Sequence, residues 1–538
     1  MALFQLIAHA PLVWGLFGLY LVGTSWLAWL GHKKTDDLES FAVGKGDMSP
    51  WVVGVTLAAS IASAATFVLN PGLVYVFGLS ALFHLGVAAA LGVIVGLFVL
   101  SFGFRRIGAK VNALTLPQWM GERYGSRAMT VMFAALNLLS LTFMVLIVAG
   151  LAIVMEATLG LTQTASVLLI IGFVFSYIFL GGTYAHAYTN TLQGVIMVII
   201  ASILVASGFD TLHGGWASIV QRLEAISPAL TAMQSSTAPL YGSTFSIWVS
   251  GFVIGFALCC QPHILTKALY VRSDREVAAY LGVTTVISLV FTALLLIGLY
   301  ARLGDIPPSA FLDATTGVPR ADAVVTVYIQ HAFGPELRAF IAVALLAAGM
   351  STLDGILVAL STIAANDLYL ELGRDRWLRE LSPAARSKSA HRASQVLLIA
   401  LGLATLVISL DPPALISIFG QIGVFAIAAA SAPPIFFGIF APRLPGKVAL
   451  TAAGVSTAVY VVLSVWARAA SASKVDLRAV VQDWGALAQV FDTSMLQLGL
   501  LNPAVPATYG VLCGVLVCLP FVRGWPGAGA TAVGAERA

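Results

Sequence analysis

Residues 340–369 read FIAVALLAAGMSTLDGILVALSTIAANDLY, a segment that is apolar apart from a few hydroxyl, amide and carboxylate side chains. It is longer than the roughly 20 residues that a helix needs to cross a bilayer. Ser351, Thr352 and Asp354 lie within about two helical turns near its centre. An acid at that depth costs roughly 2.5–3.5 kcal/mol and is seldom kept without a role. The segment therefore predicts a membrane helix that carries a functional site.

Composition places the whole chain in a membrane. Of its 538 residues 59% are hydrophobic and 10% are charged, whereas soluble domains carry roughly 25% charged residues. Backbone groups in lipid must bond within the chain, so we expect an all-α membrane protein. The basic residues lie in loops, so nucleic acid is not an expected partner, and the four cysteines lack metal-site spacing. The lipid bilayer is the expected surroundings.

About thirteen transmembrane helices are predicted, which places the two termini on opposite sides of the membrane. The basic residues favour an outer N-terminus and a cytoplasmic C-terminus, because that choice puts 21 of the 28 lysines and arginines in cytoplasmic loops. The expected location is a bacterial inner membrane. The predicted spans are 10–31, 50–77, 79–104, 127–157, 163–181, 186–207, 245–269, 277–302, 339–369, 393–410, 413–440, 448–467 and 505–523.

Two of these spans contain residues that interrupt a helix. Residues 57–75 include Pro71-Gly72 after a run of small residues, and residues 251–270 include Gln261-Pro262-His263. The two spans start five helices apart, as expected for an inverted repeat whose broken helices hold the binding site. The alternative is that each proline only kinks its helix. The predicted parts are an N-terminal helix and loop (1–49), two five-helix repeats (50–207 and 245–440), an outer loop between them (208–244), and two last helices with a tail (441–538).

Hydroxyl side chains in the 340–369 segment suggest a cation site. Ala348, Ser351 and Thr352 share overlapping faces of one helix. Together with backbone carbonyls freed at residues 59–62, the two hydroxyls would form an all-oxygen cage, which suits a hard monovalent cation such as sodium. The alternative is that each hydroxyl bonds back to its own helix.

Residues 349–369 resemble the signature helix of the sodium:solute symporter family. Other segments resemble family motifs in the same order: FAVGKGDMSPWVVGVTLAAS (41–60), NALTLPQWMGERYG (112–125), FLGGTYAHAYTNTLQG (179–194) and QPHILTKAL (261–269). The resemblance extends from about residue 37 to residue 447. It implies a LeuT-like 5+5 inverted repeat and solute uptake coupled to sodium, with no other cofactor. The sodium ligands that it implies are Ala59, Ala62, Ala348, Ser351 and Thr352.

One position departs from the family pattern. Members often carry an aspartate near the ion path where this chain has Asn190, and Asp354 on a neighbouring helix could supply the missing charge. The alternative is a weaker dependence on sodium, or protons in its place.

A small organic solute, either a carboxylate or an amino acid, is the expected cargo. The family fold places it beside the two helix breaks, where a half-helix N-terminus can receive a carboxylate. No arginine or lysine is expected deep in a span, which leaves neutral solutes open. His84 is either a hydrogen-bond donor to the solute or a packing residue. The candidate lining residues are Ser63, Thr66, Phe67, Asn70, His84, Phe143, Phe256, Cys260, Gln261 and Gln421.

Three other functions would each require different features. A channel would need a filter or a ring of polar groups along an open path, which broken helices suit less well. A membrane enzyme would need a nucleophile with its base, or a metal cluster, and the spans offer neither, so we do not expect an enzyme. A sensor on the same scaffold would need a separate signalling partner.

Overall fold

The computed structural model describes residues 10–233, 240–313, 317–375, 377–411, 416–472 and 499–522. Within these ranges the chain is helical, with one isolated bridge between Leu312 and Pro319 and no named strand. The predicted C-terminal tail and most of the last outer loop lie outside the described residues. The all-α prediction is confirmed.

Ten helical stretches of the described residues are long and apolar enough to cross a membrane, and two bent helix pairs bring the number to twelve. The helices of these spans are α2 (Pro11–His32), α4 (Pro50–Ile61), η2 (Ala65–Leu69), α5 (Asn70–Phe77), α6 (Leu79–Phe83), η3 (His84–Ala89), α7 (Ala90–Lys110), α9 (Arg127–Asn137), α10 (Ser140–Leu159), α11 (Gln163–Ala206), η6 (Phe245–Ser250), α13 (Gly251–Leu258), α14 (Pro262–Leu265), η7 (Thr266–Tyr270), α15 (Asp274–Ala293), α16 (Leu296–Leu303), α18 (Pro335–Ile363), η9 (Ala364–Leu370), α19 (Glu371–Gly373), α20 (Pro383–Leu410), α21 (Ile416–Phe440), α22 (Gly446–Ala472), α26 (Ala504–Cys518) and η11 (Leu519–Phe521).

Short helices occupy the loops: α3 (Leu38–Val43), η1 (Gly44–Gly46), α8 (Leu116–Tyr124), η4 (Phe209–Leu212), α12 (Gly215–Ile226), η5 (Pro228–Leu230), η8 (Pro308–Phe311), α17 (Val324–Ala332) and η10 (Gly499–Leu501). Proline opens α2, α4, α14, α18 and α20. The first helical position suits proline because the amide that it lacks would have no partner there.

The 44 residues of α11 form two spans rather than one. A straight helix of that length would extend about 66 Å, twice the thickness of a bilayer core. At Gly182 the backbone has φ +48° and ψ −134°, which is not helical. Tyr177 and Thr189, on either side of this glycine, both bond to the carboxylate of Asp354. The chain therefore turns back at Gly182, and counting α11 as two spans brings the total to the predicted thirteen.

Both predicted helix breaks are present. The axis bends by 59° between α4 and the stretch Ala65–Phe77, and by 63° between the stretches Phe245–Leu258 and Pro262–Tyr270. The first break lies at residues 62–64, next to the carbonyls expected to be freed at 59–62, and not at Pro71-Gly72. Pro71 instead sits in the first turn of α5, and Gly72 packs where an added Cβ would lie 1.8 Å from the Ala321 carbonyl oxygen.

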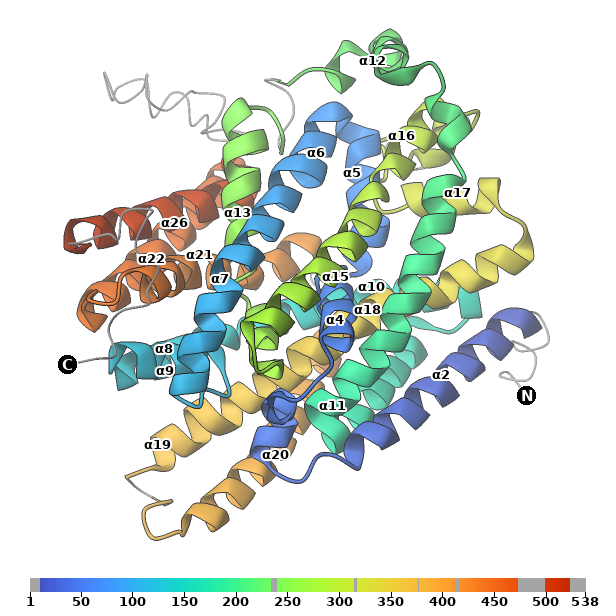
Figure 1. Ribbon diagram of the computed structural model, residues 1–538. Helices are drawn as coiled ribbons and strands as arrows, with labels where there is room; N and C mark the ends of the chain where they lie inside the picture. The colour runs from blue at the N-terminus through green and yellow to red at the C-terminus, as the bar shows by residue number, and fades with distance from the viewer. Residues whose placement is uncertain are drawn as a thin grey trace.

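Helix α18 occupies the middle of the bundle. Its most apolar 18-residue window is entirely buried, whereas only 22% of the corresponding window of α2 is buried. Figure 1 shows α2 beside α11 on one side of the molecule, α22 and α26 on the opposite side, and α4 and α18 between them. The loop helix α12 stands apart at one end of the bundle. A polar group on α18 therefore meets protein rather than lipid.

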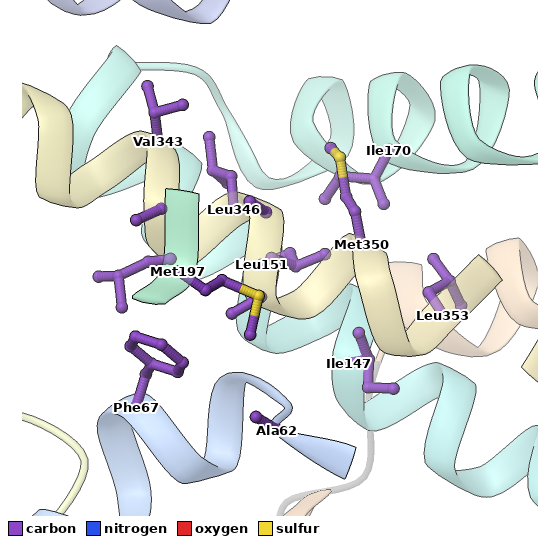
Figure 2. Packing of buried hydrophobic residues seen from close by; sticks show 14 of the residues in the cluster. Ala62, Phe67, Ile147, Leu151, Ile170, Met197, Val343, Leu346, Met350 and Leu353 are labelled. Carbon is purple, nitrogen blue, oxygen red and sulfur yellow. The ribbon is translucent and has the colours of Figure 1, made fainter. Parts of the chain in front are cut away.

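An apolar cluster surrounds the first helix break. Figure 2 shows Phe67 and Ala62 pointing toward Met197 of α11, with Leu151 and Leu346 close by. These side chains are fully or almost fully buried. Such packing excludes water and strengthens electrostatic interactions next to the break.

The turn of α11 depends on glycine at position 182. We expect Gly182→Ala to cost at least about 1–3 kcal/mol of stability, because a Cβ there would lie 2.5 Å from the Phe41 ring in a backbone conformation that alanine rarely adopts. Gly172→Ala is the matched control, since a Cβ at Gly172 would meet nothing within 4 Å. Thermal unfolding of the purified variants measures the difference. Equal melting temperatures for the two variants would contradict this explanation of the turn.

Candidate functional site

Backbone carbonyls become available where α4 ends. Ala62 follows the last helical residue with φ −84° and ψ 96°, and its amide still donates to the Ala58 carbonyl. The amide of Thr66 would bond to the Ala62 carbonyl in an unbroken helix, but here it donates to Ser63 at 2.9 Å. The break therefore releases carbonyls of residues 59–62 from the regular helical pattern.

Two hydroxyls of α18 lie against these carbonyls. Ser351 Oγ is 2.9 Å from the Ala59 carbonyl oxygen and 2.8 Å from that of Ala348. Thr352 Oγ1 is 3.4 Å from the Ser60 carbonyl oxygen and 3.5 Å from that of Ala348. All five residues are buried. The Thr352 contacts are long for hydrogen bonds, so this hydroxyl is only weakly engaged by the protein.

The structure thus brings together four of the five residues expected to bind sodium, and the fifth, Ala62, marks the adjacent break. Sequence reasoning missed the role of Ser60, whose carbonyl faces Thr352 and whose hydroxyl accepts a hydrogen bond from Asn190 at 3.0 Å. Its place inside the 59–62 stretch was the available signal.

Asn190 of α11 links the two sides of this site. Its Nδ2 donates to Ser60 Oγ at 3.0 Å and to the Ser351 carbonyl at 3.1 Å, and it lies 3.5 Å from the Thr56 carbonyl. Its Oδ1 is buried without a hydrogen-bond partner. An unsatisfied buried acceptor costs about 1–3 kcal/mol. Asn190 therefore joins α4, α11 and α18 and offers a free oxygen close to the hydroxyl cluster.

The carboxylate of Asp354 is bonded by three side chains of α11. Tyr177 donates to Oδ2 at 3.0 Å, Thr189 lies 3.3 Å from the same oxygen, and His186 Nδ1 is 2.9 Å from Oδ1. Asp354 itself is fully buried. Partners of this kind are what an ionisable group inside a membrane protein needs. Ser351 faces α4, whereas Asp354 holds together the two halves of α11. Asn190 bonds to Ser60 in the hydroxyl cluster, and its neighbour Thr189 bonds to Asp354, so these two residues connect the hydroxyl cluster to the carboxylate.

One sequence expectation is wrong: a lysine does lie deep in a span. Lys267 of η7 is 1% exposed, and its Nζ donates to the His263 carbonyl at 2.7 Å. It interacts electrostatically with Asp354, His186 and His263. The sequence placed Lys267 at the cytoplasmic end of its span, but the bend after Leu258 directs η7 into the bundle.

Three of the predicted solute-lining residues, Phe256, Cys260 and Gln261, lie at or near the second break. Gln261 donates from Nε2 to the Val424 carbonyl of α21 at 2.7 Å, and its Oε1 is buried without a partner. The Phe256 ring lies 6.2 Å from that of Phe436, also in α21. Cys260 is buried beside Gln261. Phe143 and Gln421 belong to α10 and α21, which pack against each other.

The other predicted lining residues lie near the first break or beyond it. Ser63 Oγ accepts from the Ala65 amide, and Thr66 and Asn70 are half-buried in the following turns. The Phe67 ring packs 5.6 Å from the Phe291 ring in the core. His84 donates from Nδ1 to the Ser246 carbonyl at 2.8 Å, a contact that supports its packing interpretation over a role as solute donor.

A family model and several curated proteins match most of this chain. The model of the "Sodium:solute symporter family" matches residues 41–455. The sodium/pantothenate symporter of Haemophilus influenzae is 25% identical over 83% of this chain and 88% of its own length. The sodium/proline symporter of Escherichia coli K12 is 28% identical over 66% of this chain and 68% of its own length. These relatives are transporters rather than enzymes.

A solved structure of a Na⁺-coupled sialic acid symporter matches 95% of this chain and 97% of its own, with a TM-score of 0.71 and 15% identity. At that identity the likeness concerns the fold, which is LeuT-like as predicted. Since the family model matches most of the sequence, this chain is a member of the sodium:solute symporter family.

Proposed function

We propose that this chain imports a small organic solute, a carboxylate or an amino acid, driven by a sodium ion bound between α4 and α18. The observation that carries the proposal is the pair of hydroxyls on Ser351 and Thr352 against the carbonyls of Ala59 and Ser60. Four buried oxygens on two separate helices can hold a cation. The Ala348 and Ala62 carbonyls and Asn190 Oδ1 would complete the set.

Ion binding would change where the Ser351 proton points. Its hydroxyl lies within bonding distance of both the Ala59 and the Ala348 carbonyl. With sodium present, the hydroxyl would donate to Ala348 on its own helix and offer a lone pair to the ion. Sodium would then bridge α4 and α18 and favour the state that is open to the outside and ready for solute. Loss of sodium to the cytoplasm would release the bridge.

The solute class rests on the relatives and on two helix breaks. Pantothenate and proline, named for two of the relatives, both carry a carboxylate. The second break lies directly before Pro262 of α14, and transporters built from inverted repeats bind their solute beside such broken helices. The proposed location is the bacterial plasma membrane, with the N-terminus outside and the C-terminus in the cytoplasm.

Uptake into vesicles tests this function. We expect the purified protein in liposomes to accumulate a labelled carboxylate or amino acid when sodium is higher outside, and not when potassium replaces it. A panel that includes pantothenate, proline, short monocarboxylates and neutral sugars would identify the class. Accumulation driven by a pH gradient without sodium would show that sodium is not the coupling ion. Saturable binding without accumulation would indicate a sensor.

Hydroxyl removal at the sodium site tests the ligands. Ser351→Ala and Thr352→Ala should each raise the sodium concentration for half-maximal uptake at least tenfold, because each removes one of a few ligand oxygens. Ser361→Ala and Thr362→Ala are matched controls on the same helix, since these buried hydroxyls bond to the Val358 carbonyl of their own helix. If all four variants showed the same sodium dependence, the proposed site would be wrong.

Asn190→Asp tests whether the asparagine, where family members often carry an aspartate, sets the sodium affinity of the proposed site. The variant loses the amide bonds to Ser60 and Ser351, so it should melt lower in potassium. Its added negative charge should lower the sodium concentration for half-maximal uptake. Asn137→Asp is the control, because the Asn137 amide bonds within its own helix. A lower melting temperature with unchanged sodium dependence would place Asn190 outside the ion site.

A further inference from the structure

We propose that an anionic phospholipid binds in a hollow on the outer surface of the bundle, between α2, α4 and α11. The hollow has a volume of about 620 Å³ and differs from the solute and sodium sites described above. Apolar side chains from all three helices line it, among them Leu27, Val52 and Leu192, and Lys33 and Lys34 lie at one end. The inference is independent of the proposed transport function.

The polar end of the hollow carries positive charge. Lys33 Nζ lies 3.5 Å from the centre of the Trp29 ring, and Lys34 Nζ lies 5.5 and 5.6 Å from the rings of Tyr184 and Tyr188. A hydrogen bond with Tyr188 raises the pKa of Lys34, so its ammonium stays charged. Neither lysine is within 4 Å of a carboxylate among the described residues.

One acid reduces this charge without cancelling it. Asp47 interacts electrostatically with Lys34, but its Oδ1 already accepts a hydrogen bond from Tyr184 at 2.7 Å. Lys33 lies beside the Trp29 ring, whereas Asp47 is bonded to Tyr184. Lys33 and Lys34, the charged side chains in the lining of the hollow, therefore present positive charge that an anionic group complements.

Exposed tryptophans show the depth at which these lysines lie. Trp29 and Trp51 are 51% and 57% exposed, on helices whose outer surfaces face lipid. Tryptophans in that position are typical of the boundary between headgroups and acyl chains. Lys33 and Lys34 come directly after the end of α2, a few residues beyond Trp29. They therefore lie among the lipid headgroups.

The hollow itself extends from that boundary into the apolar layer. Tyr188 and Val195, both in its lining, are seven residues apart on α11 and span about 10 Å of helix. An acyl chain fits this apolar stretch, while the phosphate at its head meets the two lysines. The combination of an apolar hollow and a cationic mouth at the interface points to a phospholipid with net negative charge rather than to a soluble anion or a zwitterionic lipid.

The bound lipid would join the N-terminal helix to the transport core. Helix α2 already contacts α11, where Gln193 Nε2 donates to Tyr20 at 2.8 Å. Thr191, which lines the hollow, is next to Asn190 at the candidate ion site. A lipid bound in the hollow would therefore pack against the outer face of the α11 segment whose inner face carries Asn190.

Native mass spectrometry of the detergent-purified full chain, titrated with dioleoyl phosphatidylglycerol or dioleoyl phosphatidylcholine, tests the proposal. We expect one phosphatidylglycerol to be retained per chain and phosphatidylcholine to be lost. Lys33→Gln with Lys34→Gln should weaken retention about thirtyfold, the equivalent of about 1 kcal/mol for each lysine. The control is Lys110→Gln with Lys447→Gln, a pair of lysines outside the hollow.

A second variant keeps the charges and fills the apolar hollow. Leu192→Trp should also reduce retention of phosphatidylglycerol while the melting temperature of the lipid-free protein stays near that of the wild type. Equal retention of the two lipids, or retention that neither Lys33→Gln with Lys34→Gln nor Leu192→Trp reduces, would overturn the proposal. None of these outcomes depends on solute uptake, so the transport function is tested separately.

Discussion

The contact between two hydroxyls of α18 and the carbonyls at the broken end of α4 is the interaction on which the rest of this account depends. Ser351 bonds to Ala59 across the interface, and Thr352 lies close to Ser60. A helix that ends inside a membrane leaves carbonyls that water cannot satisfy, so partners must come from protein or from a bound ion. The position of α18 at the centre of the bundle, buried along its apolar window, makes it the helix that can supply them.

Buried polar groups extend from this contact into α11. Asn190 joins the hydroxyl cluster to α11, and the neighbouring Thr189 belongs to the set of side chains that surround Asp354. Because Tyr177 and His186 bond to the same carboxylate from either side of the turn at Gly182, the acid also holds the two halves of α11 together. The candidate ion site and the folding of its neighbouring helix thus share one polar network, surrounded by packed apolar side chains.

Much of this could be predicted from the sequence, because membrane helices have few ways to be built. Apolar length predicted the spans, and the hydroxyls of Ser351 and Thr352 indicated which face of the helix matters. The run of small residues and the freed carbonyls expected at 59–62 indicated the first break, which lies at residues 62–64. Pro71 was a misleading signal, because in the first turn of a helix the amide that proline lacks has no partner to lose. The burial of Lys267 and the partners of Asp354 depend on how helices bend and meet, which no single segment reveals.

The central claim is that sodium bridges α4 and α18. The most direct measurement is a pair of experimentally determined structures of the purified protein, one in sodium and one in potassium, at a resolution that shows bound ions. If sodium binds there, density will be present in sodium in contact with the Ala59 carbonyl and the Ser351 and Thr352 hydroxyls, and absent in potassium. Direct contact between Ser351 and Ala59 in both structures, with no ion between the two helices, would contradict it.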